Sequence, residues 1–288
     1  MTGCVIESYI MDILFSTGCL YTYAMPEIFE MAKAAGYDGI ELLISHNNCN
    51  MEAERIQEIS DEYDISILSL HSPFLICEGW GGFWDRIWRS LAMAMELSIP
   101  LVNFHPPTGL FPRHHLDGQL SEYIKVYKDL IQNSDIILTI ENLPTIPVFR
   151  GSFINRIFPR MINNMYQIAR FVADNGIHST FDTTHIGTTG VNLLEAYGVF
   201  KDRIANIHLS DHDGRSQHIL PGSGHLPLRE LLAQVKSDGY DGTITLETCP
   251  AAMEHEDKAK AAQNARSSLE YIKNALQISN VGRKMELA

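Results

Sequence analysis

The chain has 288 residues, of which 45% are apolar and 20% charged, with 35 acidic against 22 basic residues. This length suits one large domain or two small ones, and the composition is that of a globular protein rather than a disordered one. The formal charge of -13 repels a polyanion unless a local basic patch overcomes it, so nucleic acid is a disfavoured partner.

The five cysteines are scattered, odd in number and free of any CxxC pair. They predict neither a disulfide framework nor a zinc ribbon, and they favour a cytoplasmic location. The sequence shows no run of about 18 apolar residues and no basic, then apolar, then small-residue start. We therefore expect neither a membrane span nor a signal peptide.

Eight short apolar runs rich in β-branched residues predict strands. In chain order they begin at Ile13, Gly39, Ile65, Leu101, Ile136, Ser179, Ile204 and Thr243. Most intervals carry a helical pattern, such as "PEIFEMAKAAG", in which Pro26 suits a first helical turn and Gly36 a helix exit. The tetrapeptide GYDG occurs at Gly36 and again at Gly239, each time between a predicted helix and a strand.

Eight βα units with nearly continuous apolar strands predict an α/β protein with a (β/α)8 TIM barrel. The rival is an open doubly wound sheet, but no GxGxxG follows the first strand. We expect a single barrel domain over residues 12–277, with an N-terminal tail at 1–11 and a C-terminal tail at 278–288. The last helix is predicted near residues 257–277.

Polar side chains end seven of the eight predicted strands. They are Glu41 and His46, His71, His105, Glu141 with Asn142, Asp182 and His185, His208 and Asp211, and Glu247. Taken singly, such a histidine is more often a hydrogen-bonded packing residue, and such an acid often caps the next helix. Because the carboxyl ends of the strands meet at one mouth of a barrel, the whole set predicts a single active site there.

Several carboxylates forced together in a mouth of low dielectric constant repel one another unless a cation neutralises them. A divalent metal held by Glu141, Asp182, His208 and Glu247 is the simplest interpretation. Three oxygen donors and one imidazole suit Mn, Co, Mg or Zn, and the sequence does not choose among them. No organic cofactor is indicated.

At these residues the chain resembles the xylose isomerase-like barrels, a superfamily of sugar isomerases and epimerases that also contains the endonuclease IV-type DNA repair enzymes. The resemblance runs from about residue 12 to 276 and rests on an ordered set of motifs: "GYDGIEL", "HSPF", "NFHP", "TIEN", "FDTTH", "IHLSD" and "LET". It implies the same four metal ligands, with Glu141 and Glu247 also acting as acid and base. It further implies that His185 and Arg215 hold the substrate, and it makes His71 and His105 candidates for substrate binding.

The endonuclease branch has a three-zinc pattern that requires more histidines and an Asp-x-His after the seventh strand. The chain supplies His71, His105, His185 and His218, but Ser216 stands where that pattern has its aspartate. Losing an anionic ligand weakens a dication site, so a third zinc is not expected. A second metal at His71, His105 and His218 remains a candidate.

The resemblance therefore predicts a metal-dependent sugar or sugar phosphate isomerase or epimerase that acts through an enediolate. Because Glu141 and Glu247 come from different strands, they suit removal and return of a proton on opposite faces, although a 1,2 aldose-ketose shift stays open. The alternatives are a zinc phosphodiesterase acting on abasic DNA, a metal-dependent lyase or dehydratase of a polyol acid, a metal hydrolase and a non-catalytic binding module. A homo-oligomer is compatible with the sequence.

Two long loops are candidates for setting specificity. Residues 143–161 carry Arg150, Arg156 and Arg160, which either clamp a phosphate or face solvent. Residues 75–84, "LICEGWGGFW", form either an apolar lid over the mouth or a segment that packs against a helix.

Overall fold

The computed structural model describes residues 11–107, 113–144 and 165–277. Eight parallel strands close into a barrel in sequence order, so the predicted TIM barrel is confirmed. The strands are β1 (Ile13–Ser16), β2 (Gly39–Leu43), β3 (Ile67–His71), β4 (Leu101–Phe104), β5 (Ile137–Glu141), β6 (His178–Asp182), β7 (Ile204–Leu209) and β8 (Thr243–Leu246).

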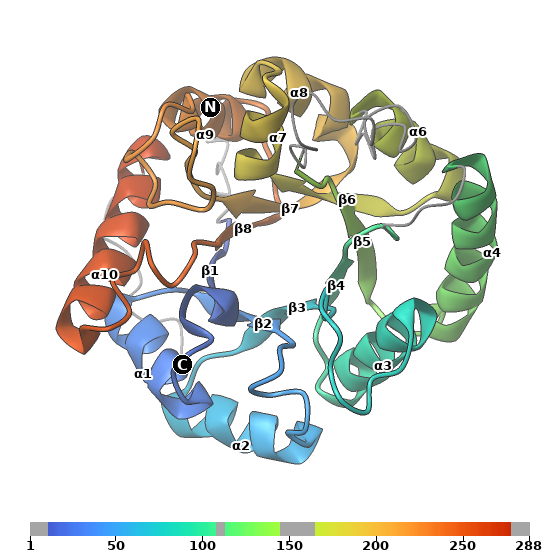
Figure 1. Cartoon of the computed structure of the whole chain (residues 1–288), viewed down its shortest axis with the longest axis horizontal. Helices are drawn as coiled ribbons and strands as arrows, with labels where there is room; N and C mark the ends of the chain where they lie inside the picture. The colour runs from blue at the N-terminus through green and yellow to red at the C-terminus, as the bar shows by residue number, and fades with distance from the viewer. Residues whose placement is uncertain (1–10, 108–112, 145–164, 278–288) are drawn as a thin grey trace, which may run out of the picture.

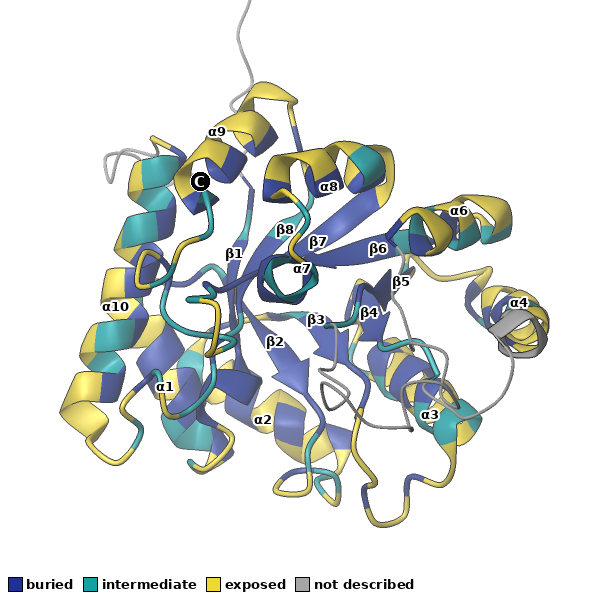
Figure 2. Cartoon of the chain, turned by 45° about the horizontal axis from the view of Figure 1, so that its top comes forward, coloured by how far each residue is buried: buried dark blue, intermediate teal, exposed yellow. Residues whose placement is uncertain are grey.

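Helices surround the barrel as an outer ring (Figure 1). Those in the described segments are α1 (Met25–Ala35), α2 (Ala53–Tyr63), α3 (Phe83–Glu96), α4 (Arg113–Ile131), α6 (Met165–Asn175), α7 (Thr183–Thr189), α8 (Leu193–Phe200), α9 (Leu228–Ser237) and α10 (Lys258–Ala275), with the 3-10 turns η1 (Thr17–Leu20) and η2 (Lys201–Arg203). The strands are almost wholly buried, whereas the helices expose their outer faces (Figure 2). None of these described helices has the length and apolarity that crossing a bilayer requires.

The two GYDG segments behave as helix exits. Gly36 follows α1 with a φ of 93°, and its N–H donates to the carbonyl of Ala32. Gly239 follows α9 with a φ of 72°. Both glycines lie in the left-handed region that a side chain disfavours, which explains why the same short sequence recurs before β2 and β8.

The described elements lie between Ile13 and Ala275, inside the predicted barrel domain. Residues 1–10 and 278–288 lie outside the described residues, so the two tails remain predictions.

The interior of the barrel is unusually polar. Bulky branched side chains commonly fill a TIM barrel. Here the strands instead contribute fully buried polar residues that hydrogen-bond to one another beneath the mouth. They are Glu41, Ser69, Asn103, Thr139, Thr180, Asn206 and Thr245. This layer supports the side chains above it, at the carboxyl ends of the strands.

Candidate active site and metal centre

The structure brings together the four side chains predicted to bind metal. Glu141 ends β5, Asp182 ends β6, His208 lies near the end of β7, and Glu247 directly follows β8. One donor atom from each lies within 4.8 Å of the others. The Nδ1 atom of His208 is 2.8 Å from Glu247 Oε2, 3.4 Å from Glu141 Oε2 and 3.9 Å from Asp182 Oδ2.

The hydrogen bonding of these four residues fits a cation. Each has a buried atom without a hydrogen-bond partner in the described structure: Glu141 Oε1, Asp182 Oδ2, His208 Nδ1 and Glu247 Oε2. Leaving a buried polar atom unpaired costs about 1–3 kcal/mol, and more for a charged group. Three of these atoms, Asp182 Oδ2, His208 Nδ1 and Glu247 Oε2, lie near one another, and Glu141 Oε1 faces His185 Nδ1 at 3.0 Å. The unpaired atoms indicate a missing positive partner, and three carboxylates with one imidazole suit a divalent metal.

Histidines offer a second way to neutralise the acids. Burial would lower the pKa of His185, but Asp182 and Glu141 outweigh it and raise the pKa to about 9. Burial raises the pKa of Asp182 to about 6. Yet the 2.8 Å contact between His208 Nδ1 and Glu247 Oε2 lacks the alignment of a hydrogen bond. The imidazole of His208 therefore leaves Glu247 Oε2 without a hydrogen bond, and a metal bound between these two atoms would give both of them a partner.

His71 and His105 approach Glu141 from β3 and from the residue after β4. Their Nε2 atoms lie 3.2 and 3.4 Å from Glu141 Oε2. His71 Nδ1 contacts the carbonyl of Ser72 at 2.8 Å, which fixes that nitrogen as the donor. His71, His105 and Glu141 thus form a second group with the spacing of metal ligands.

His218 lies in a different group from His71 and His105. It clusters with Asp182 and His185, and its Nε2 atom is 3.2 Å from Nε2 of His185. In both rings Nδ1 faces a carbonyl oxygen, that of Asn142 for His185 and that of Glu247 for His218. In the neutral rings two lone pairs therefore face each other, so a proton or a cation must lie between them. The three residues named as a second metal set from the sequence are divided between two groups.

Asp182 has a structural task besides its place in the cluster. Its Oδ1 atom accepts from the backbone N–H of His185 at 2.6 Å, so it caps α7. The predicted strand from Ser179 to His185 therefore stops at Asp182, and His185 lies in the first turn of a helix. Asn142 holds the segment from β5, donating to the carbonyl of Asp182 and accepting from its N–H.

The loop after β7 has mainly structural contacts. Asp211 accepts backbone N–H groups from His212, Gly222, Gly224 and Leu226, so this strand-end acid ties the loop together. The backbone N–H groups of Arg215 and Ser216 both donate to Asp213. Arg215 is exposed, and its predicted contact with a substrate remains a prediction.

The described residues at the mouth of the site are only partly exposed, and one of them is apolar. Glu247 is 14% exposed at its side chain and His105 and His218 are each 23% exposed, whereas Glu141 is wholly buried. The half-exposed ring of Phe74 stacks on His105 at 5.3 Å. Glu247 is thus the more accessible of the two glutamates, and Glu141 lies behind the histidines that contact it.

The tryptophans of residues 75–84 do not cover this mouth. Trp80 is buried and its indole N–H donates to the carbonyl of Cys49. Trp84 stacks on Tyr123 of α4 at 4.0 Å. Both tryptophans therefore pack against the scaffold, which was the predicted alternative to a lid. The three arginines proposed as a phosphate clamp, at 150, 156 and 160, lie outside the described residues.

Comparison with known protein families identifies the family of this chain. The family described as xylose isomerase-like TIM barrel matches residues 29–275. The chain belongs to this family.

Its relatives include an uncharacterized protein of Mycobacterium tuberculosis, 26% identical over 280 residues, covering 88% of this chain and 96% of that protein. Fructoselysine 3-epimerase of Escherichia coli O157:H7 is 25% identical over 237 residues, covering 76% of this chain and 83% of the enzyme.

Among solved structures, D-psicose 3-epimerase from Clostridium cellulolyticum superposes with a TM-score of 0.71 at 14% identity, covering 92% of this chain and 99% of that one. An AP endonuclease of family 2 from Brucella melitensis has a TM-score of 0.70 at 15% identity, covering 91% and 99%. At such identities the structures share the fold with this chain, and the fold hosts both chemistries.

Three further residues support the cluster. Glu41 and Asn142 were predicted only as members of the strand-end set, and Glu41 lies in the middle of β2 rather than at its end; Asn103 was not predicted. Asn103 donates to Glu141 Oε2 at 2.6 Å, and Asn142 orients Asp182 and His185. Glu41 accepts from His208 Nε2 at 3.0 Å. Asn103 and Glu41 are single polar residues inside apolar strands. A polar residue in such a position is buried and needs hydrogen-bond partners, and this is the sequence signal that could have identified both.

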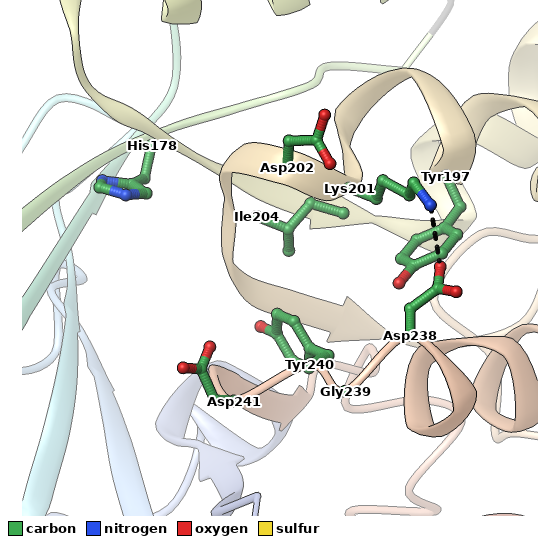
Figure 3. Close-up of a pocket in the computed structure, with 9 residues that line it drawn as sticks. All are labelled: His178, Tyr197, Lys201, Asp202, Ile204, Asp238, Gly239, Tyr240 and Asp241. Atoms are coloured by element: carbon green, nitrogen blue, oxygen red, sulfur yellow. Dashed lines mark hydrogen bonds and ion pairs between the residues drawn. The ribbon is translucent and has the colours of Figure 1, made fainter.

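A cavity of about 270 Å³ lies at the other end of the barrel. Its lining includes the first residues of β6 and β7, His178 and Ile204, and the segment before β8 (Figure 3). In TIM barrels the chemistry lies at the carboxyl ends of the strands, so this cavity is separate from the metal centre.

Proposed function

We propose that the protein is a divalent-metal-dependent epimerase or isomerase of a sugar or sugar phosphate. The observation that carries the proposal is the convergence of Glu141 and Glu247 on His208 Nδ1, at 3.4 and 2.8 Å, from strands on either side of β6 and β7. Each glutamate also has an oxygen without a hydrogen-bond partner in the described structure. The similarity to a fructoselysine 3-epimerase supports this substrate class.

The two carboxylates suit a proton transfer beside a carbonyl group. Glu247, at the mouth, would take a proton from the carbon next to the carbonyl, and Glu141, protonated by exchange with solvent beforehand, would return one from the other side. Loss of the proton from Glu247 to solvent would then restore the starting state. Epimerisation needs two such groups because the proton leaves one face of the carbon and arrives on the other. Both acids come from rigid strand ends, which keeps their separation fixed.

Glu141, Asp182, His208 and Glu247 would hold the metal. When bound, a divalent ion at these ligands polarises the carbonyl and stabilises the negative charge of the enediolate. The partly exposed His105 and the buried His185 carry imidazole nitrogens that can bind sugar hydroxyls. The apolar ring of Phe74 over His105 limits access of water to the reacting carbon.

Solvent deuterium exchange tests the proposal. Purified protein with added Mn, Co or Mg is incubated in deuterium oxide with a panel of ketoses and ketose phosphates. We expect one or more sugars to gain a single deuterium next to the carbonyl and to yield an epimer or aldose on chromatography. Absence of exchange across the panel with every metal would contradict enediolate chemistry, and the polyol-acid lyase would then be tested.

A phosphodiesterase acting on abasic DNA is the second candidate. The observation in its favour is that His71 and His105 share Glu141 with the first cluster, while His185 and His218 face each other beside Asp182. Two or three zinc ions per chain with cleavage of an abasic-site duplex would support it. One metal per chain with no cleavage would support the epimerase. The charge of -13 and the exposed Ser216 favour the epimerase, with one metal per chain and no cleavage of DNA.

A further inference from the structure

A buried carboxylate behind the proposed metal ligands has no part in the chemistry described so far. Glu41 lies in the middle of β2 and has no exposed surface. One oxygen, Oε2, accepts three hydrogen bonds: from Ser69 Oγ at 2.8 Å, from His208 Nε2 at 3.0 Å and from Asn206 Nδ2 at 3.2 Å. The side chain thus links β2 to β3 and to two positions of β7.

A structural role alone does not explain a charge at this position. A buried carboxylate is costly unless a positive or strongly polarised partner offsets it. The contacts of Glu41 in the described structure come from a hydroxyl, an amide and an imidazole, all to Oε2, whereas the buried Oε1 has no hydrogen-bond partner there. A neutral glutamine would accept the same three hydrogen bonds at lower cost, so the negative charge points to the imidazole of His208.

The direction of the hydrogen bond sets the form of that imidazole. Because Nε2 faces a carboxylate, Nε2 carries the hydrogen, and in the neutral ring Nδ1 carries the lone pair. It is Nδ1 that lies 2.8 Å from Glu247 Oε2 and 3.4 Å from Glu141 Oε2. Glu41 therefore presents the free nitrogen of His208 to the cluster.

Neighbouring residues hold this pair in place. Thr243 and Thr245 of β8 each donate to Asn206 Oδ1 at 2.9 Å, which turns the amide N–H of Asn206 toward Glu41. The ring of His71 stacks against His208 with centroids 5.8 Å apart. The orientation of His208 is fixed before any ligand arrives.

We propose that Glu41 is a positioning residue, which holds His208 in the Nε2–H form and strengthens Nδ1 as a ligand. The proposal rests on the metal site of the proposed function. A partner of this kind typically contributes a factor of about 10 to 100 in metal affinity. Glu41 belongs to none of the groups of described residues that have the spacing of metal ligands, so its role would be exerted through His208.

The test measures Mn2+ affinity by calorimetry and the visible absorption of Co2+ on purified, metal-free protein. We expect Glu41→Ala to bind Mn2+ about 10- to 100-fold more weakly than wild type and to shift the Co2+ spectrum. Glu41→Gln keeps the volume and an acceptor oxygen but loses the charge, so its affinity should fall by about tenfold. Ser69→Ala is the control, since it removes a donor to the same oxygen and leaves the carboxylate on His208. It should change affinity less than either variant and leave the spectrum in place.

The outcomes separate the two proposals. A purely structural Glu41 would lower the melting temperature of the metal-free protein without changing the Co2+ spectrum. Wild-type affinity in Glu41→Gln, with His208→Ala strongly weakened, would overturn the role of Glu41 and leave the metal site standing. If Glu41→Ala does not fold, Glu41→Gln decides by the same criterion. Absence of metal binding in wild type would overturn the metal site and the role of Glu41 together.

Discussion

The two ends of the barrel each gather acidic residues, and only one end has the properties of a reactive site. At the amino end Asp202, Asp238 and Asp241 line the cavity of Figure 3 and are exposed. Asp238 accepts from Gln234 at 2.8 Å and from Lys201 at 3.4 Å. These acids have water or partners, so they need no further cation.

At the carboxyl end of the barrel the acidic side chains are buried and some of their oxygens lack hydrogen-bond partners. Glu141 and Asp182 have no exposed side-chain surface, and each has an oxygen without a hydrogen-bond partner in the described structure. Three described carboxylates line the cavity and three belong to the cluster around His208. The difference shows that burial combined with missing partners, rather than acidity, indicates where a cation would bind.

The tyrosines at the amino end agree with this contrast. Burial, followed by the carboxylate of Asp238, raises the pKa of Tyr197 to about 12, so its hydroxyl stays protonated at neutral pH. The hydroxyl of Tyr240 donates to the carbonyl of Thr243 at 2.9 Å. Both hydroxyls stay protonated at neutral pH, as is usual for tyrosines of a scaffold.

The largest expected effect comes from the glutamates at the carboxyl end. Glu141→Gln and Glu247→Gln keep the shape and an oxygen donor but remove the group that accepts a proton. We expect each to lower kcat by a factor of about 10² to 10⁴ while the fold is retained. Turnover and circular dichroism are measured together. Glu122→Gln, an exposed glutamate of α4 paired only with Lys125 in the described structure, is the matched control and should keep full activity. Wild-type rates in both site variants would show that these carboxylates move no proton.

A smaller effect is expected on stability when metal is added. A ligand that binds only the folded state at 100 times its Kd stabilises that state by about 2.7 kcal/mol. Thermal or urea unfolding with and without Mn2+ measures the difference. Asp182→Asn removes a charged ligand at the carboxyl end and should abolish the gain, whereas Asp202→Asn at the amino end should keep it. The reverse pattern would place the cation at the wrong end of the barrel for the proposed chemistry.

Much of the scaffold follows from the sequence because local signals and tertiary packing agree. Seven of the eight strands begin within one residue of the predicted position, and β3 begins two residues later. The final helix, predicted near 257–277, spans Lys258–Ala275. Proline at a helix start and glycine at its exit act through the backbone alone, so short sequence segments suffice to place them.

The site was predicted less completely, because its hydrogen bonds join residues of different strands that are far apart in the sequence. The rim position of Glu141, Asp182, His208 and Glu247 follows from their place at strand ends. The pairing of Glu41 with His208 joins residues 167 apart in sequence, and no local pattern records it. The separation of His218 from His71 and His105 depends on the path of the β7–α9 loop. That path is set by the many hydrogen bonds that Asp211 accepts from the loop backbone.

The smallest effect is expected at the amino end of the barrel. A large effect there would contradict the distinction between the two ends. Asp238→Asn weakens one ion pair between a 24% exposed carboxylate and a 44% exposed ammonium group. Such pairs contribute about 0–1 kcal/mol because water screens them, so the free energy of unfolding should fall by no more than about 1 kcal/mol. Lys201→Ala removes the same pair from the other side and should give a similar value. Mn2+ affinity and turnover should equal those of wild type in both variants, since the cavity lies beyond the far end of the strands from His208. A tenfold loss of either property in Asp238→Asn would mean that the cavity communicates with the metal centre, and the acids of the two ends could no longer be separated by their burial and hydrogen bonding.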